Sequence, residues 1–195
     1  MTTNLYFVRH AHSTYTPDEL GRPLSEQGYL DANTVTEFLK TENIDNIYSS
    51  PYKRAIQTVE GIAKYIDKEI VLVDEFKERV LSEKPVVDFT SAITKVWQDF
   101  DFSLDGGESN RMAQKRGVNA TIQLLEYNDG KNIVVGTHGN LMVLIMNYFD
   151  KSMDSTFGRN LKCQIYTNYH LTVKNWWMYK EFGNDSKKII NNLNP

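Results

Sequence analysis

The stretch Leu5-Tyr6-Phe7-Val8-Arg9-His10 decides the fold, because four apolar residues run without interruption into two polar ones. A short continuous apolar run is typical of a strand that is buried on both faces of a sheet. The abrupt change from apolar to polar residues at Arg9 is typical of a buried strand that ends at a polar site. We therefore predict a first strand over residues 5–8, with a functional group at its carboxyl end.

Strand and helix patterns alternate along most of the chain. Apolar runs predict further strands at 44–48, 70–73 and 133–136. Apolar residues at helical spacing predict helices over 25–41, 51–66, 109–127 and 141–149. Ser25 and the serine before Pro51 are expected to cap two of these helices. The alternation predicts an α/β fold, a three-layer α/β/α sandwich around a mostly parallel central sheet.

One segment breaks this alternation. From about 79 to 107 the chain carries Pro85, a predicted helix around 86–97 and the turn sequence Asp105-Gly106-Gly107. We predict here a helical insertion that lies over the site as a lid. Alternating residues predict two more strands within 164–173 and 176–182, and the polar end at about 184–195 is expected to be frayed. No linker separates these parts, so residues 1–195 are predicted to form a single domain.

The composition excludes several classes of function. Hydrophobic residues make up 41% of the 195 and charged residues 24%, and the net charge is −3. A globular protein of this charge has no general positive field to attract nucleic acid or an anionic membrane. Cys163 is the only cysteine, so no intramolecular disulfide can form and a cytoplasmic location is expected. No apolar run is long enough to span a bilayer. The oligomeric state is left open.

Polar side chains follow each of the four strands predicted to be parallel. They are Arg9 and His10, then Arg54, then Glu78, then His138. Ligands of parallel α/β sheets bind beyond the carboxyl ends of the strands, so these side chains are expected to share one crevice. Two arginines and two histidines there favour the binding of a compact dianion such as phosphate, because one guanidinium group can donate hydrogen bonds to two phosphate oxygens at once. The helix start at Gly139-Asn140 is expected to add free backbone N–H donors.

Four blocks of the chain resemble one known family. Phe7-Val8-Arg9-His10-Ala11-His12-Ser13 resembles the Arg-His-Gly signature of the histidine phosphatase superfamily, also called the phosphoglycerate mutase-like family, with Ala11 in place of the usual glycine. Leu24-Ser25-Glu26-Gln27-Gly28 is similar to the family's Leu-Thr-x-x-Gly helix start. Residues 49–58 are similar to its second arginine block, and residues 134–139 to its second histidine block. The blocks stand in the family's order over most of the chain.

The resemblance implies a phosphatase of the histidine acid phosphatase type, which hydrolyses a phosphate monoester without a cofactor or a metal. His10 resembles the nucleophile that forms a phosphohistidine, and Glu78 resembles the proton donor. The groups implied to hold the phosphoryl oxygens are Arg9, Arg54, His138 and Gly139. The implied partner is a small phosphorylated substrate.

Several nearby residues have competing interpretations. Glu75 and Glu83 compete with Glu78 for the role of the acid, although residues 72–78 resemble the family's approach to its acid and favour Glu78. His12, Ser13 and Glu108 are candidates for the rim of the pocket. Glu108 is explained equally well as a carboxylate at the start of a helix.

Three alternative functions are open. A mutase of the phosphoglycerate type is disfavoured because such enzymes are longer and carry tryptophan and asparagine where this chain has Thr14-Tyr15-Thr16. A metal-dependent hydrolase would use His10 and His12 as a His-x-His ligand pair. Such enzymes are built on barrels of about 250 residues, longer than this chain. A non-catalytic phosphate-binding module is disfavoured because both arginines and both histidines are intact.

Overall fold

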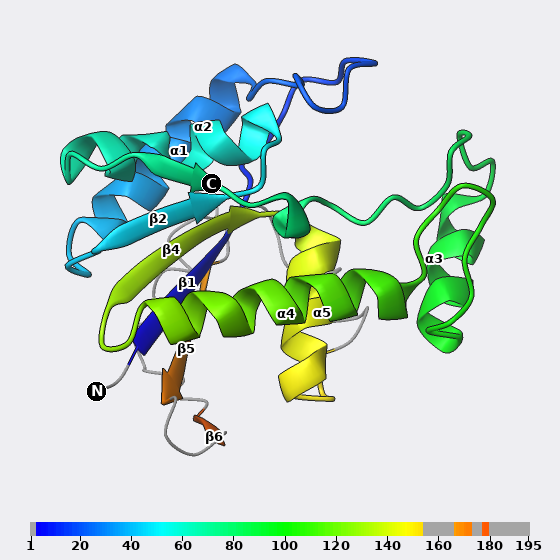
Figure 1. The fold of residues 1–195 in the computed structure, drawn as a ribbon. Coiled ribbons are helices and arrows are strands. Elements are labelled where there is room, and N and C mark those ends of the chain that lie inside the picture. The colour runs from blue at the N-terminus through cyan, green and yellow to red at the C-terminus, as the bar shows by residue number, and fades with distance from the viewer. Residues whose placement is uncertain (1–2, 154–165, 173–176, 180–195) are drawn as a thin grey trace.

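A six-stranded sheet forms the centre of the computed structural model, which describes residues 3–153, 166–172 and 177–179 (Figure 1). The strands are β1 (Thr3–Arg9), β2 (Asn46–Ser49), β3 (Ile70–Leu72), β4 (Asn132–Thr137), β5 (Tyr166–Thr172) and β6 (Trp177–Tyr179). Their order across the sheet is β3-β2-β4-β1-β5-β6. The first four strands in that order are mutually parallel, and β5 and β6 are antiparallel at one edge. The prediction of a mostly parallel sheet is confirmed.

Helices cover both faces of the sheet. One face packs against α1 (Glu26–Leu39) and α2 (Lys53–Tyr65), and the other against α4 (Asn110–Tyr127) and α5 (Gly139–Phe149), as Figure 1 shows. A short 3-10 helix, η1 (Asp74–Phe76), follows β3. The chain therefore folds as the predicted α/β/α sandwich.

The side chains of β1 alternate between the two helical layers. Leu5 and Phe7 lie in the core with α4 and α5, whereas Tyr6 and Val8 lie in the core with α1 and α2. All four are at most 2% exposed. A strand between two helical layers needs an apolar residue at every position, and each such burial contributes about 1.5–3 kcal/mol. This explains the uninterrupted apolar run that ends at Arg9.

The two predicted serine caps have different outcomes. Ser25 Oγ accepts the N–H of Gly28 at 3.1 Å and caps α1, as expected. A Cβ on Gly28 would lie 2.0 Å from the carbonyl oxygen of His12, so only glycine lets α1 pack this closely against the loop that follows His10. The cap expected before Pro51 is wrong, because Tyr52 is the N-cap of α2 and caps it with no side-chain hydrogen bond.

The insertion carries a single described helix, α3 (Phe89–Gln98), which starts at Phe89 rather than near residue 86. Figure 1 shows α3 beside the first turns of α4, away from the sheet. Asn110 Nδ2 donates to the Val96 carbonyl at 2.8 Å, and the N–H of Arg111 donates to the Phe100 carbonyl at 2.9 Å. The insertion is thus attached to the start of α4, and its action as a lid stays a prediction.

The end of the chain is described only in part. The strands predicted within 164–173 and 176–182 are present as β5 and β6. Cys163 and the tail predicted to fray at 184–195 lie outside the described residues. Of the helices in the described ranges, none combines the length and the apolar character needed to cross a bilayer.

Candidate active site

The sheet brings the predicted polar residues to one edge. Arg9 ends β1 and His10 follows it, Arg54 lies in the first turn of α2, and His138 lies between β4 and α5. Because β1, β2 and β4 are parallel neighbours, their carboxyl ends meet. The imidazole centroids of His10 and His138 are 5.2 Å apart, with the rings edge to face.

One hydrogen bond assigns the tautomer of His10. Its Nδ1 lies 2.8 Å from the carbonyl oxygen of Ala11. A carbonyl oxygen can only accept, so Nδ1 carries the proton, and in the neutral ring Nε2 keeps its lone pair. The geometry therefore presents an unprotonated nitrogen, the form that can attack an electrophilic centre.

The environment of His10 also keeps the ring neutral. The pKa of His10 is lowered to about 4, chiefly by burial and also by the positive charges of Arg54 and Arg9, against the hydrogen bond to Ala11, which raises it. The ring is therefore unprotonated at neutral pH, and the arginines that would bind an anion also help to keep the imidazole in its nucleophilic form.

His138 is fully buried and is oriented by Ser50. Its Nε2 lies 2.8 Å from Ser50 Oγ, and that hydroxyl also accepts the N–H of Tyr52 at 3.3 Å. Burial, then the nearby His10 and Arg54, hold the pKa of His138 well below its usual range. A neutral His138 that accepts the Ser50 proton at Nε2 carries its own proton on Nδ1. That Nδ1 is buried and has no hydrogen-bond partner among the described residues, so it is a donor suited to an anion's oxygen.

Arg54 is only 4% exposed and contacts Glu19 from the loop before α1. Its Nη1 donates to the Glu19 carbonyl at 2.8 Å and lies 3.3 Å from the Glu19 carboxylate, which also pairs with Arg22. The Arg54 Nε is buried and has no partner within the described part of the chain. An acidic side chain of the protein itself thus partly neutralises the arginine that is expected to bind phosphate.

Gly139 lets Arg9 approach the start of α5. A Cβ on residue 139 would lie 2.9 Å from Arg9 Nε. The Arg9 guanidinium therefore lies against the first residue of α5, next to His138. This close approach is a physical reason for glycine at the predicted phosphate site.

Glu78 lies at the amino end of α5, beside His138. Its carboxylate accepts the N–H groups of Asn140 at 3.1 Å and Leu141 at 3.0 Å, together with that of Arg79 at 2.9 Å. The expectation that Asn140 offers a free N–H to phosphate is therefore wrong, because Glu78 already uses it. The same contacts hold the carboxylate at the edge where the two histidines meet.

The other candidate acids lie elsewhere. The side chains of Glu75 and Glu83 are exposed. The backbone N–H of Glu83 donates to the Asp105 carbonyl at 3.0 Å, which places Glu83 in the insertion. Of the three carboxylates, only Glu78 is seen to contact the first turn of α5.

The predicted rim residues have structural partners. His12 is exposed, and its Nδ1 lies 2.7 Å from the capping hydroxyl of Ser25, while Ser13 forms an antiparallel bridge with Leu24. Both residues therefore join the loop after His10 to the start of α1. Glu108 pairs with Arg116 of α4 at 2.8 Å.

The two histidines of the His-x-His pair form hydrogen bonds with different protein groups. The Nδ1 of His10 is bonded to Ala11, and that of His12 to Ser25. Among the residues that the structure describes, no group of three or more His, Cys, Asp or Glu side chains is placed to hold a metal ion.

Comparison with known proteins identifies the family. The model of the histidine phosphatase superfamily (branch 1) matches residues 5–180. The chain belongs to the histidine phosphatase superfamily. The match includes β1 from Leu5 on, the edge formed by His10 and His138, and the described strands β5 and β6, so the resemblance seen in the four sequence blocks is confirmed.

Relatives of this histidine phosphatase include both phosphatases and mutases. The chain is 27% identical over 190 residues to a metal-independent phosphoserine phosphatase of Arabidopsis thaliana, covering 89% of this chain and 79% of the relative. It is 28% identical over 149 residues to a 2,3-bisphosphoglycerate-dependent phosphoglycerate mutase of Thermoplasma acidophilum, covering 71% and 70%.

Solved structures share the fold. A phosphoserine phosphatase of Entamoeba histolytica, solved as a mutant with phosphoserine, superposes with a TM-score of 0.74 at 21% identity, over 95% of this chain and 98% of that one. A mycobacterial glucosyl-3-phosphoglycerate phosphatase superposes with a TM-score of 0.72 at 19% identity, over 87% and 91%.

Two groups near the site of this histidine phosphatase were not found from its sequence. The sequence pattern around Ser50 predicts a helix cap, and Glu19 lies in a polar loop that indicates no functional role. A serine or an acidic residue in such surroundings has many ordinary explanations, and only the folded chain brings Ser50 to His138 and Glu19 to Arg54.

The His10 imidazole is expected to titrate near pH 4 in the folded protein, against 6.5 in an unfolded chain. Between these values the unfolded state binds a proton that the folded state excludes, so the free energy of unfolding should fall as pH decreases from about 6.5 toward about 4. NMR titration of the ring resonances measures this pKa directly. Arg54→Met should raise it while leaving it below 6.5, since burial is the larger cause. A wild-type midpoint at or above 6.5 would contradict the structure.

Ser50→Ala is expected to lower kcat/KM of this histidine phosphatase by about tenfold, the effect of losing one buried hydrogen bond that sets the His138 tautomer. Ser49→Ala is the matched control, because Ser49 is equally buried but its hydroxyl donates to the Ser50 carbonyl at 2.8 Å and not to a histidine. Steady-state kinetics on one phosphate ester compares them. Equal losses in the two variants would show a packing effect rather than a role for the histidine contact.

Glu19→Gln is expected to lower the KM for a phosphate ester by up to about fivefold, because the exposed Glu19 carboxylate, in an interaction worth about 0.2–1 kcal/mol, no longer competes for the buried Arg54. Glu26→Gln, an exposed residue at the start of α1, removes the same charge without contacting Arg54 and serves as the control. A higher KM in Glu19→Gln would mean that Glu19 orients Arg54 for the substrate instead of competing with it.

Proposed function

We propose that the protein is a phosphatase that hydrolyses a phosphate monoester through a phosphohistidine on His10. The observation that carries the proposal is the neutral His10 ring, with its Nδ1 proton committed to Ala11, facing a buried His138 at the edge that Arg9 and Arg54 share. This arrangement supplies a nucleophile and the cationic and N–H donors for a phosphoryl group. The chemistry that we propose is of the histidine acid phosphatase type.

In the first step, His10 Nε2 attacks phosphorus and forms the P–N bond as the bond from phosphorus to the ester oxygen breaks. Glu78, in its protonated form, gives its proton to the departing oxygen, and the alcohol leaves. Arg9, Arg54 and the Nδ1 proton of His138 bind the phosphoryl oxygens. Such donors act chiefly by being in place before the charge is redistributed.

In the second step, water attacks the same phosphorus atom. The Glu78 carboxylate takes a proton from that water, the P–N bond breaks, and inorganic phosphate leaves. His10 returns to the neutral ring with a free Nε2, and Glu78 returns to its protonated form. The cycle consumes one water per ester and needs no further reactant.

Phosphatase activity is favoured over mutase activity. A relative matched over most of both chains is a phosphoserine phosphatase, while a phosphoglycerate mutase is matched over a smaller share. We propose a small phosphorylated metabolite as the substrate, with phosphoserine and 3-phosphoglycerate as the first compounds to test. A cytoplasmic location, with no role for nucleic acid or membrane, completes the proposal.

A panel of phosphate monoesters tests this function through the release of inorganic phosphate. Phosphosugars, phosphoglycerates, phosphoserine, nucleotides, phosphopeptides and an aryl phosphate cover the main leaving groups. We expect turnover that survives exhaustive chelation and is inhibited by vanadate, which imitates the geometry of phosphoryl transfer. Transfer of phosphate between glycerate positions without net release would favour the mutase. Activity lost on chelation and restored by zinc or manganese would favour the metal-dependent hydrolase.

A further inference from the structure

Arg116 and Glu108 form a half-buried ion pair near the amino end of α4. Arg116 Nε and Nη2 each lie 2.8 Å from a different oxygen of the Glu108 carboxylate. The side chains are 22% and 24% exposed. Burial raises the pKa of Glu108, but the hydrogen bond and the charge of Arg116, together with the Val80 N–H and the charge of Arg79, lower it by more, so its pKa lies below the usual value. A two-point pair of this kind fixes direction as well as distance.

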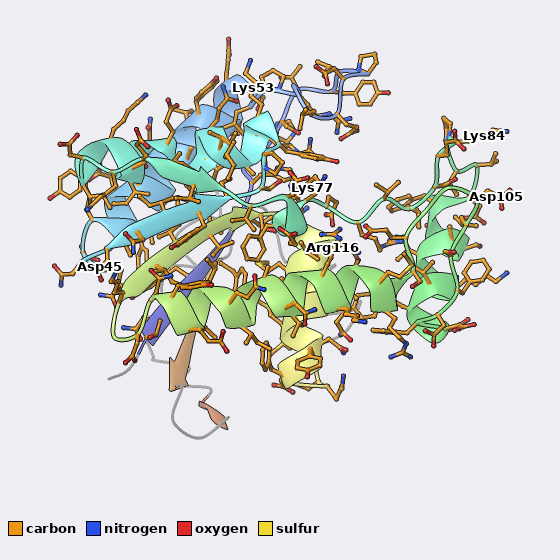
Figure 2. All side chains as sticks on the ribbon, in the orientation of Figure 1. Asp45, Lys53, Lys77, Lys84, Asp105 and Arg116 are labelled. Carbon is orange, nitrogen blue, oxygen red and sulfur yellow. The ribbon has the colours of Figure 1, made fainter. Side chains whose placement is uncertain are left out.

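The same guanidinium also holds the backbone that leads to Glu78. Arg116 Nη1 donates to the carbonyl oxygens of Glu75 at 2.5 Å and Lys77 at 2.9 Å, and Nη2 lies 3.4 Å from that of Glu78. Figure 2 shows Arg116 reaching from α4 toward η1, close to Lys77. All three guanidinium nitrogens of Arg116 therefore donate hydrogen bonds, either to the Glu108 carboxylate or to the backbone of residues 75–78.

Glu108 holds the chain on the other side of Glu78. Its N–H donates to the Val80 carbonyl at 2.8 Å, and its carboxylate accepts the Val80 N–H at 3.4 Å. Residues 75–78 are thus bound by Arg116, and Val80 is bound by Glu108. The backbone is therefore attached on both sides of the residue proposed to carry the proton, by Arg116 of α4 on one side and by Glu108, just before α4, on the other.

We infer that Arg116 and Glu108 are a positioning pair, which sets the Glu78 carboxylate at the amino end of α5 beside His138. The inference rests on the proposed function, in which Glu78 is the acid. The carboxylate end of Glu78 is bound by Asn140 and Leu141, and its backbone end by the Arg116–Glu108 pair. Displacement of a catalytic group by about 1 Å can cost on the order of 10²-fold in rate. Fixing both ends of Glu78 keeps it at the reacting oxygen.

The kinetic test compares two leaving groups. Arg116→Lys keeps the charge but loses the planar two-point geometry, and Glu108→Gln keeps the shape but loses the charge. Each is expected to lower kcat for an alkyl phosphate by about 10- to 100-fold and for an activated aryl phosphate by less than about threefold, because the aryl oxygen needs little protonation. In a Glu78→Gln background, Arg116→Lys should cause no further loss on the alkyl ester.

A matched control lies on the same helix. Arg111 of α4 makes a two-point pair with Asp101, at 2.5 and 2.9 Å, but the two side chains are 59% and 66% exposed and the pair contacts the insertion side of the helix. Arg111→Lys makes the same chemical change without touching the Glu78 segment. This variant is expected to keep kcat for both the alkyl and the aryl phosphate within about twofold of the parent value.

A second readout does not depend on catalysis. The amides of Asn140 and Leu141 donate to Glu78, so their hydrogen exchange reports whether the carboxylate is in place. Glu78→Ala should accelerate exchange at both amides. Arg116→Lys and Glu108→Gln are expected to accelerate it by about three- to tenfold, and Arg111→Lys is expected to leave it unchanged.

The outcomes separate this inference from the proposed function. Faster amide exchange in both pair variants, with the loss confined to the alkyl ester, supports it. Unchanged exchange at Asn140 and Leu141, or equal losses on both esters that add to the effect of Glu78→Gln, overturns it. If no ester is hydrolysed, the proposed function fails instead, and if Glu78→Gln does not distinguish the leaving groups, the proposed role of Glu78 as the acid fails. The exchange measurement then still decides whether the pair positions Glu78.

Discussion

His10→Ala is expected to lower kcat for every phosphate ester by on the order of 10⁴-fold or more, because His10 is the proposed nucleophile and no other group that the structure describes at this edge offers an unprotonated nitrogen. His10 Nδ1 is bonded to the Ala11 carbonyl, which leaves Nε2 as the proposed attacking atom, and the pKa of about 4 keeps that atom unprotonated at neutral pH. Alanine removes the nucleophile but keeps the arginines and His138. Binding of vanadate or phosphate should therefore persist while turnover is lost.

Trapping of the phosphoenzyme identifies the nucleophile directly. Substrate labelled in the phosphoryl group, quenched rapidly without acid, should leave an acid-labile label on the parent protein and none on His10→Ala. His12→Ala is the matched control, since His12 is exposed and bonded to Ser25. It should retain both the label and most of the activity. A label that persists in His10→Ala and disappears in His12→Ala would move the nucleophile to His12.

The strands that position the site could be predicted because burial on two faces leaves a strong pattern. Leu5 to Val8 has no polar residue because both faces of β1 are covered, and the same holds for residues 133–135 of β4. Once these strands are taken as parallel neighbours, the convergence of His10 and His138 follows from topology alone. The most reliable sequence inference was therefore the one that depended on the core.

Side-chain partners were harder to predict because they depend on direction as well as position. Ser50 lies one residue before Pro51, where a serine is usually a helix cap, yet its hydroxyl bonds a histidine 88 positions away. The helix starts two residues later than that pattern suggests, and this frees the hydroxyl. Local sequence cannot distinguish these two uses of a serine.

Charged residues gave the weakest signal. Arg116 lies in the second turn of a helix with many polar residues, and only the fold shows that its guanidinium binds three backbone carbonyls and Glu108. At Asn140 the predicted interaction with an anion is present, but the predicted partner is wrong. A helix start does offer N–H donors to an anion, but the anion that they bind is the protein's own Glu78. In both cases the general principle held and the identity of the partner required the structure.

Glu78→Gln is expected to lower kcat for an alkyl phosphate by about 10²- to 10⁴-fold, the range for loss of a general acid, and for an activated aryl phosphate by less than about tenfold. An alkoxide is a poor leaving group and needs the proton, whereas an aryl oxide departs without it. Glutamine is close to glutamate in size, but Asn140 and Leu141 donate to different oxygens of the Glu78 carboxylate, so the single side-chain oxygen of glutamine keeps one of these two contacts and loses the other. The ratio of the two rates is the measured quantity.

Two other glutamates provide the comparison for this ratio. Glu83→Gln changes an exposed residue of the insertion. Glu75→Gln changes an exposed side chain, and it is the backbone carbonyl oxygen of this residue that contacts Arg116. Neither change should alter the ratio of alkyl to aryl turnover, because neither carboxylate contacts the first turn of α5 in the described structure. A larger change of the ratio at Glu75 or Glu83 than at Glu78 would reassign the acid. Equal losses on both esters in Glu78→Gln would show that this carboxylate supports the site without giving its proton to the leaving oxygen.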